Sequence, residues 1–425
     1  MARIPPPVLD AARPASGHPR RRLIPIVAAA GVTVPAIAIR LGGSAPPEWL
    51  AAVIFGLGIV GAAFLLAWGA EALQLDVSQG LALAVLALIA VLPEYAVDFT
   101  FALKAGEDPH RYAPLALANM TGGNRLLIGV GWSLVVLLAA WRITRIARTQ
   151  GYEGPLDTDV TLDRPHAIEI AFLAVASVYS LTLPLKRTLS PVDTLVLVSL
   201  FVWYAARISR APAEKPRLVG PAELIGRLPV AQRRAVVGLM LTGSAGVILI
   251  SAEPFAEALV STGENFGIST FLLVQWVAPL ASESPEFIVA LLFALKGAAA
   301  AGMGTMISSK VNQWTLLVGA LPAAFALSGG HLGPMHLDAR QREEIFLTSA
   351  QSLFALIVVS DFRFSLGEAL LLFVLFVPQF LYTHELGRLV EAGVYLVLSL
   401  VWIAGSRSVR AGVRDLLPRP RRRRR

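Results

Sequence analysis

Long apolar segments dominate the alternation of hydrophobic and polar positions along the chain. A helix that crosses a membrane needs about 20 mostly apolar residues, and segments of this kind recur almost to the C-terminus. The pattern predicts about twelve spanning helices, near residues 23–41, 50–73, 79–104, 113–141, 166–185, 190–208, 235–258, 267–296, 303–328, 343–361, 364–383 and 389–406. We therefore expect an all-α membrane protein.

The composition agrees with that expectation. Only 16% of the residues are charged, 55% are hydrophobic and the mean hydropathy is +0.64, whereas soluble domains carry about 25% charged residues. The chain has no cysteine, which excludes disulfides, thiolate metal sites and cysteine nucleophiles.

Basic residues predict how the chain is oriented in the membrane. Arginines and lysines cluster before the first predicted helix, within residues 142–164 and 207–234, and at the C-terminus. Cytoplasmic loops carry an excess of Lys and Arg, so we expect a cell-membrane protein with both termini in the cytoplasm. The basic termini are suited to anionic lipid headgroups, and no motif predicts a nucleic-acid partner.

Two segments of the chain resemble each other. Residues 92–106 read LPEYAVDFTFALKAG and residues 284–298 read SPEFIVALLFALKGA. In the predicted topology they cross the membrane in opposite directions, which indicates two inverted repeats. Each repeat has five predicted helices, and one extra helix lies at each end of the chain. The expected division is an N-terminal segment, the first repeat, a cytoplasmic linker, the second repeat and a C-terminal segment, at residues 1–49, 50–208, 209–234, 235–383 and 384–425.

A proline lies within the predicted span of each repeat copy. Pro93 and Pro285 lack an N–H, so each leaves the carbonyl four residues earlier without its helical partner. These carbonyls belong to Ile89 and Ala281. Substrate sites of inverted-repeat transporters lie where helices are broken near the midplane, so the two prolines predict a cation site.

The same segments resemble the sodium/calcium exchanger superfamily, the cation/Ca²⁺ antiporters. That family has a motif like G-T-S-L-P-E in each repeat, followed on the next helix by G-N-x-x-G-S-N. Here residues 89–94 read IAVLPE and residues 118–124 read ANMTGGN, while residues 281–286 read ASESPE and residues 304–310 read GTMISSK. The resemblance implies alternating access to one midplane site, with Glu94 and Glu286 as the central acids.

The chain departs from the family pattern at several oxygen-bearing positions. The hydroxyl pair before Leu-Pro-Glu is replaced by Ala90-Val91 in one copy and by Ser282-Glu283 in the other. The family serine falls on Gly123 and Ser309, its asparagine on Asn124 and Lys310, and its more distant amide or acid on Leu127 and Gln313. Because sodium sites of the family depend on such oxygens, the sequence favours a divalent cation or protons over sodium.

The predicted site is rich in carboxylates. Glu94 and Asp98 are one helical turn apart, and Glu283 and Glu286 are three residues apart, so each pair shares a helix face. Ca²⁺ prefers six to eight oxygen ligands. Four buried carboxylates repel one another, so they favour binding either protons or a cation. We predict metal ligation by Glu94 and Glu286 within a cation site of Glu94, Asp98, Asn119, Asn124, Ser282, Glu283, Glu286 and Ser309.

Two basic residues lie next to these positions. Lys310 is interpreted either as an internal charge partner of Glu283 or Glu286, or as a helix-end lysine that reaches the membrane surface. Arg125, beside Asn124, poses the same choice.

These features predict a secondary-active antiporter that exchanges Ca²⁺ or another cation for H⁺ or Na⁺. No cofactor is expected apart from the transported cation. A transport-inactive cation sensor or a channel on the same fold is the alternative. The chain lacks the His-Glu-x-x-His motif of zinc proteases and the Tyr-Asp and Gly-x-Gly-Asp pair of intramembrane aspartyl proteases, so we do not expect an enzyme.

Overall fold

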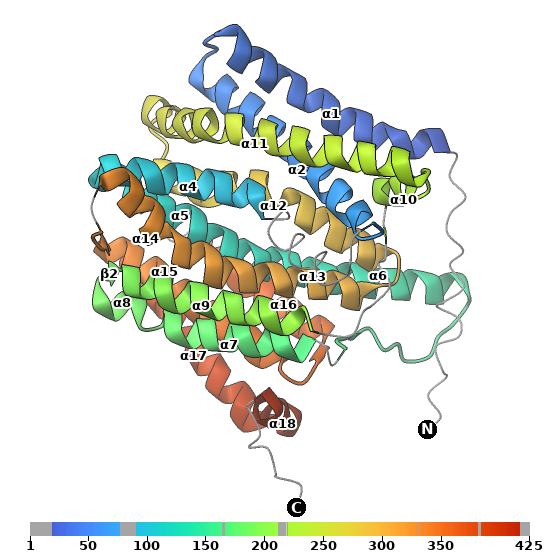
Figure 1. Cartoon of the computed structure of the whole chain (residues 1–425). Coiled ribbons are helices and arrows are strands. Elements are labelled where there is room, and N and C mark those ends of the chain that lie inside the picture. Colours follow the sequence, from blue (N-terminus) through green and yellow to red (C-terminus); the bar gives the residue numbers. More distant parts are fainter. Residues whose placement is uncertain are drawn as a thin grey trace, which may run out of the picture.

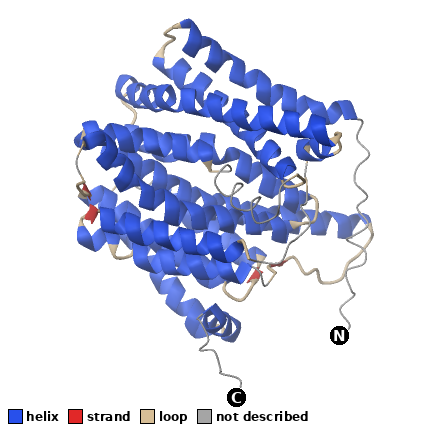
Figure 2. Cartoon of the chain, in the orientation of Figure 1, coloured by secondary structure: helices blue, strands red, loops and turns tan. Residues whose placement is uncertain are grey.

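The structure is a computed structural model and describes residues 19–76, 91–163, 166–210, 218, 220–330, 332–380 and 384–416. Over these residues the chain is almost entirely helical, and four very short strands lie near the ends of helices (Figure 2). The helices run roughly side by side through one bundle (Figure 1).

The first half of the chain contains eight described α-helices. They are α1 (Pro19–Gly42), α2 (Glu48–Leu73), α4 (Leu92–Glu107), α5 (Pro109–Leu126), α6 (Ser133–Thr149), α7 (Ala167–Ser180), α8 (Leu183–Lys186) and α9 (Pro191–Ile208).

The second half contains nine described α-helices. They are α10 (Pro221–Gly226), α11 (Val230–Phe266), α12 (Thr270–Leu295), α13 (Ala299–Asn312), α14 (Val318–Gly329), α15 (Ala339–Val359), α16 (Leu366–Phe376), α17 (Glu385–Gly405) and α18 (Arg407–Leu416). A 3₁₀ turn, η4 (Val377–Phe380), follows α16.

The predicted fold class is confirmed. Nine helical segments among the described residues are long and apolar enough to cross a membrane. The third predicted helix is described only from Leu92 onwards, because residues 77–90 lie outside the described part of the chain. Two further predicted helices correspond to α15, which begins with several charges, and to the shorter α16.

Figure 1 shows how the bundle is arranged. Helices α1, α2 and α11 form one edge, and α17 and α18 form the opposite edge. Between these edges, α12 packs against α5 and α13, and α4 packs against α5 and α14. Each of these central groups joins helices from both halves of the chain, so the interior is built from the two halves together.

Two pairs of strands show that the halves share one template. β1 (Val160–Thr161) pairs antiparallel with β4 (Arg363–Phe364), and β2 (Thr188–Leu189) pairs with β3 (Met335–His336). β1 and β3 precede α7 and α15, while β2 and β4 precede α9 and α16. Each strand therefore pairs with a strand of the other half, as expected for a pseudo-two-fold arrangement.

Backbone details repeat at the same spacing. Arg187 and Phe362, 175 residues apart, are the two non-glycine residues with positive φ in the described chain, at 59° and 62°. Capping boxes begin α9 at Ser190 and α16 at Ser365, again 175 residues apart. The loops before the last helix of each repeat thus have the same construction.

A π-helical segment interrupts the corresponding long helix of each half. η1 (Leu127–Trp132) joins α5 to α6, and η3 (Gln313–Leu317) joins α13 to α14. Such segments recur at functional sites in proteins. Each begins three residues after the position occupied by Asn124 in one half and Lys310 in the other.

An ion-pair cluster joins the end of α2 to the start of α11. Asp76 accepts hydrogen bonds from Arg233 at 2.6 and 2.9 Å and from Arg234 at 3.1 Å. The Arg233 hydrogen bond, assisted by Arg234, lowers the pKa of the Asp76 carboxyl to about 2. The carboxylate therefore stays charged at all physiological pH values and ties the two halves together outside the spanning helices.

Candidate functional site

The first central acid, Glu94, lies in the first turn of α4. Its side chain is buried, and its Oε2 accepts a hydrogen bond of 3.1 Å from Nε2 of Gln313. Gln313 opens the π-helical segment of the other half. The first repeat thus supplies the acid and the second repeat supplies the amide that holds it.

The second central acid, Glu286, lies on α12 and is partly buried. Its Oε2 accepts a hydrogen bond of 2.5 Å from Oγ of Ser309 on α13. Helix α12 runs without interruption through Pro285, and Oγ of Ser284 donates to the Ala281 carbonyl at 3.4 Å. The expected break and free carbonyl at Ala281 are therefore wrong, because a nearby hydroxyl replaces the missing N–H. Ile89 lies outside the described residues.

Two further carboxylates lie beside the central acids. Asp98 is fully buried and accepts a hydrogen bond of 2.8 Å from Asn119 at Oδ1, while its Oδ2 has no hydrogen-bond partner among the described residues. Glu283 is buried, and neither of its oxygens has a hydrogen-bond partner of good geometry within the described part of the chain. Glu94 lies close enough to Asp98, Glu283 and Glu286 to interact with their charges. The structure thus gathers the four predicted carboxylates in one region.

Lys310 lies inside the protein. Its side chain is fully buried, and Nζ donates to the backbone oxygen of Asn124 at 3.1 Å and to Oδ1 of the same residue at 2.7 Å. Nζ also lies 4.6 Å from the centroid of the Trp314 ring. These contacts exclude the alternative of a lysine that reaches the surface. Asn124 and Lys310 occupy equivalent positions, so the two repeats meet directly at this contact.

The remaining predicted ligands have local partners. Oγ of Ser282 donates to the Ala278 carbonyl at 3.2 Å, and Nδ2 of Asn124 donates to the Met120 carbonyl at 2.8 Å. The Ser282 hydroxyl is therefore engaged by its own helix. The Oδ1 atom of Asn119 has no hydrogen-bond partner in the ranges that the structure describes, and it is the oxygen that this residue offers to the region of the carboxylates.

The carboxylates do not form a compact metal cluster. Among the described residues, no three His, Asp or Glu side chains are grouped closely enough to hold a metal ion. The partners of the acids are of three kinds: an amide at Glu94 and at Asp98, a hydroxyl at Glu286, and the nearby amine of Lys310 at Glu283. Ligation of a cation by Glu94 and Glu286 stays a prediction.

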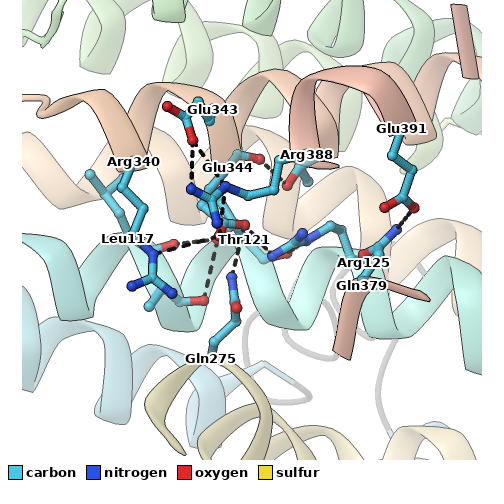
Figure 3. A network of polar contacts seen from close by, with 12 residues as sticks. Leu117, Thr121, Arg125, Gln275, Arg340, Glu343, Glu344, Gln379, Arg388 and Glu391 are labelled. Carbon is cyan, nitrogen blue, oxygen red and sulfur yellow. Dashed lines mark hydrogen bonds and ion pairs between the residues drawn. The ribbon is translucent and has the colours of Figure 1, made fainter. Parts of the chain in front are cut away.

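Arg125 belongs to a second buried network (Figure 3). It forms an ion pair of 2.5 Å with Glu344 of α15, and the two side chains are only 2% and 3% exposed. Nε2 of Gln275 donates to the same carboxylate oxygen at 2.9 Å. Arg388 of α17 pairs with the adjacent Glu343 at 2.6 Å. Arg125 is thus neutralised away from the four carboxylates.

Sequence reasoning did not find the acids of this second network. Glu343 and Glu344 open a predicted helix, where charges are usual at the membrane surface, and their arginine partners are distant in the chain. Gln313 was visible only as the family's amide position. One signal in the sequence could have pointed to Glu344. A Glu-Ile pair occurs at Glu169 and again at Glu344, 175 residues later, and the same spacing separates β1 from β3 and β2 from β4.

Comparisons with known proteins agree with this architecture. The family described as sodium/calcium exchanger protein matches residues 48–209 and 236–383. The crystal structure of an H⁺/Ca²⁺ exchanger, CAX, is 40% identical in sequence, with a TM-score of 0.85 over 94% of this chain and 98% of that chain. No match was found among curated proteins.

Two more distant structures share the fold. YfkE is 12% identical, with a TM-score of 0.61 over 87% of this chain and 99% of that chain. The sodium-calcium exchanger NCX_Mj is 16% identical, with a TM-score of 0.53 over 79% of this chain and 99% of that chain. Since the family match covers most of the chain, this multi-pass membrane protein belongs to the sodium/calcium exchanger family.

Proposed function

We propose that this cation antiporter exchanges Ca²⁺ for H⁺ at a site centred on Glu94 and Glu286. The observation that carries the proposal is the cross-repeat arrangement of buried carboxylates. Glu94 and Glu286 occupy equivalent places on α4 and α12, and Asp98 and Glu283 lie beside them. The 40% identity to the H⁺/Ca²⁺ exchanger CAX over nearly the whole chain supports the same pair of ions.

The chemistry of exchange follows from competition for these carboxylates. Without a cation, several acids in a poorly solvated interior repel one another, and binding protons relieves that repulsion. A Ca²⁺ ion relieves it as well, because the ion prefers carboxylate and carbonyl oxygens. Binding one species therefore displaces the other, which couples their transport when the site is presented to each membrane face in turn.

The polar partners of the acids favour protons over sodium as the counter-ion. Ser309 and Gln313 donate hydrogen bonds to Glu286 and Glu94. At the position equivalent to Ser309 the first repeat has Gly123, which offers no oxygen, and at the position of Asn124 the second repeat has Lys310. Sodium ions are thus left with few ligands, whereas carboxylates accept protons directly.

The proposed orientation follows the basic segments. Loops 142–164 and 207–234 lie on the cytoplasmic side, and both termini lie there too, in a cell membrane. The basic ends of the chain, including the exposed Arg407 of α18, face anionic headgroups.

Uptake of radiolabelled Ca²⁺ into proteoliposomes tests the proposal. Vesicles with an imposed proton gradient should accumulate Ca²⁺, and an equal sodium gradient should not drive it. Glu94→Gln and Glu286→Gln should each reduce proton-driven uptake by about 100-fold or more, as expected when a group that carries the proton is removed. Glu264→Gln, which alters an exposed carboxylate paired with Arg111, is the matched control.

Other outcomes have definite meanings. Uptake driven only by sodium would contradict the proton assignment. Flux that neither saturates nor depends on a counter-ion would indicate a channel, and Ca²⁺ binding without any flux would indicate a sensor.

A further inference from the structure

A buried carboxylate outside the proposed cation site lies in the first turn of α7. Glu169 is only 5% exposed. It is the equivalent, at the 175-residue spacing, of Glu344. Unlike Glu344, it has no arginine partner among the residues that the structure describes, which leave out residues 164–165. A buried carboxylate without a compensating cation is costly, so its surroundings suggest a role in handling protons.

Three side chains surround the Glu169 carboxylate. Oε2 lies 2.7 Å from Nδ1 of His166, and Oγ of Ser308 on α13 donates to Oε1. The hydroxyl of Tyr204 on α9 lies near Ser308 and interacts with the Glu169 charge. His166 and Tyr204 are therefore the titratable groups that face Glu169, one from its own segment and one from a neighbouring helix.

His166 connects this cluster to the outside of the protein. Its side chain is 20% exposed, while that of Glu169 is 7% exposed. The imidazole lies directly against Gly304 of α13, where an added Cβ would come within 2.9 Å of Nε2. The glycine thus leaves room for the ring between the start of α7 and α13.

The inner end of the cluster reaches a central acid. Ser308 is followed by Ser309, whose Oγ donates to Glu286 at 2.5 Å. His166, Glu169 and Ser308 thus contact one another, and Ser309 and Glu286 form a second contact one residue further along α13. Consecutive residues of a helix do not face each other, so a route between the two serine hydroxyls requires a bridging water.

We propose that His166, Glu169 and Ser308 form the route by which protons reach Glu286 from the membrane face where α7 begins. This inference rests on the proposed Ca²⁺/H⁺ exchange. It assigns a role to His166 and Glu169, which lie outside the motifs shared with the family, and to Ser308, which stands at the second glycine position of the motif at residues 304–310. By the distribution of basic residues, this face is the cytoplasmic one.

The proton balance of the route is simple. A proton binds the outer ring nitrogen of His166, Nε2, and the inner nitrogen releases one to Oε2 of Glu169. The protonated carboxyl of Glu169 then turns so that its O–H donates to Oγ of Ser308. Ser308 takes this proton while its own hydroxyl proton passes to the bridging water, a proton of the water passes to Ser309, and the hydroxyl proton of Ser309 passes to Glu286. The serines and Glu169 end as they began, and His166 returns to its first tautomer by exchange with water. The net change is one proton moved from water to Glu286.

The test uses full-length protein in lightly buffered proteoliposomes. Glu169→Gln, His166→Gln and Ser308→Ala are compared for proton-driven Ca²⁺ uptake, for its dependence on pH, and for equilibrium Ca²⁺ binding. We expect each variant to slow uptake by about tenfold or more, at the low end of the range for a lost proton-transfer group. The pH dependence should flatten, while the Kd for Ca²⁺ changes by less than about twofold.

Two matched controls separate the route from general damage. Thr305→Val removes a hydroxyl one turn away on α13 that bonds only within its own helix, to Ala301, in the contacts described. Glu264→Gln neutralises an exposed carboxylate. Both should keep the rate and the pH profile of the unmodified protein.

The outcomes distinguish the two proposals. If the unmodified protein shows proton-driven uptake and Glu169→Gln keeps the same rate and pH profile, the route is overturned while Ca²⁺/H⁺ exchange stands. Loss of Ca²⁺ binding in step with uptake in all three variants would also overturn it, because these residues would then support the cation site itself. Absence of proton-driven uptake by the unmodified protein would overturn both proposals.

Discussion

Glu169 and Glu344 occupy equivalent places in the two halves of the molecule, yet their surroundings differ in charge. Each lies near the start of the helix that follows a two-residue strand, α7 after β1 and α15 after β3. Each contacts the long π-interrupted helix of the other half, Glu169 through Ser308 on α13 and Glu344 through Arg125 on α5. The two glutamates therefore occupy the same position relative to the strand and helices around them.

The difference lies in what neutralises each carboxylate. Glu344 is fixed by Arg125 at 2.5 Å and Gln275 at 2.9 Å, with Arg388 and Arg340 within 4.0 Å (Figure 3). Glu169 has a histidine and a hydroxyl instead. Arginine keeps its charge at all physiological pH values, whereas histidine changes its charge near neutrality. The two repeats therefore use one equivalent position differently: Glu344 forms a fixed ion pair, and Glu169 is placed to accept and release protons.

The largest effect on stability should come from breaking the ion pair between Arg125 and Glu344. Arg125→Met leaves Glu344 as a buried charge without its main partner, which should lower the free energy of unfolding by about 3–5 kcal/mol. Denaturation in detergent measures the change. Arg111→Met, which removes the partner of the exposed Glu264, is the control and should cost about 0–1 kcal/mol. Equal small changes in both variants would mean that burial does not distinguish the two pairs.

A second difference between the halves concerns space. Ser309 in one half corresponds to Gly123 in the other, and a Cβ at Gly123 would overlap Oε1 of Glu283. Because Oε1 is the end of a side chain that can move aside, Gly123→Ala should lower the free energy of unfolding by about 1 kcal/mol, at the low end for overpacking. Gly246→Ala, where nothing lies within 4 Å of the added atom, should be neutral or slightly stabilising. Thermal unfolding of the two variants side by side measures the effect, and similar midpoints would contradict it.

An effect of similar size, on cation binding, is expected at the contact between Lys310 and Asn124. Lys310→Met removes the amine that lies close to Glu283 and Glu94, and with it the capacity of this position to carry a positive charge, so the site becomes more attractive to a divalent cation. The Kd for Ca²⁺ should fall by about tenfold, equal to about 1.4 kcal/mol. Isothermal titration calorimetry provides the measurement, with the exposed Lys296→Met as control. An unchanged Kd would show that the ammonium does not act on the bound cation.

Much of the fold could be predicted because a membrane-spanning helix is recognisable in a sequence as a long run of apolar residues. The helices at residues 50–73 and 190–208 differ from α2 and α9 by at most two residues at either end. The course of α5 and α6 was less predictable. Residues 109–149 form one continuous helical segment with a π-helical segment inside it, and nothing in an apolar pattern marks an extra residue in a helical turn.

The candidate site was predictable to the extent that its residues repeat. Glu94 and Glu286 follow from the two Pro-Glu motifs, and the structure gathers Asp98 and Glu283 beside them. The partners of these acids were not predictable, because Gln313 and Lys310 contact residues that are 219 and 186 positions away in the chain. Such contacts depend on how the two halves of the chain pack against each other, and one sequence alone does not predict that packing.

The interlocking of the halves also sets an order of events during synthesis. Arg125 precedes its partner Glu344 by 219 residues in the chain. At a translation rate of about 5–20 residues per second, the arginine waits roughly 10–40 s for its carboxylate. During that interval the first half must shield a charge that the finished protein buries. Assembly therefore depends on keeping α5 out of the lipid, in water or beside the insertion machinery, until α15 arrives.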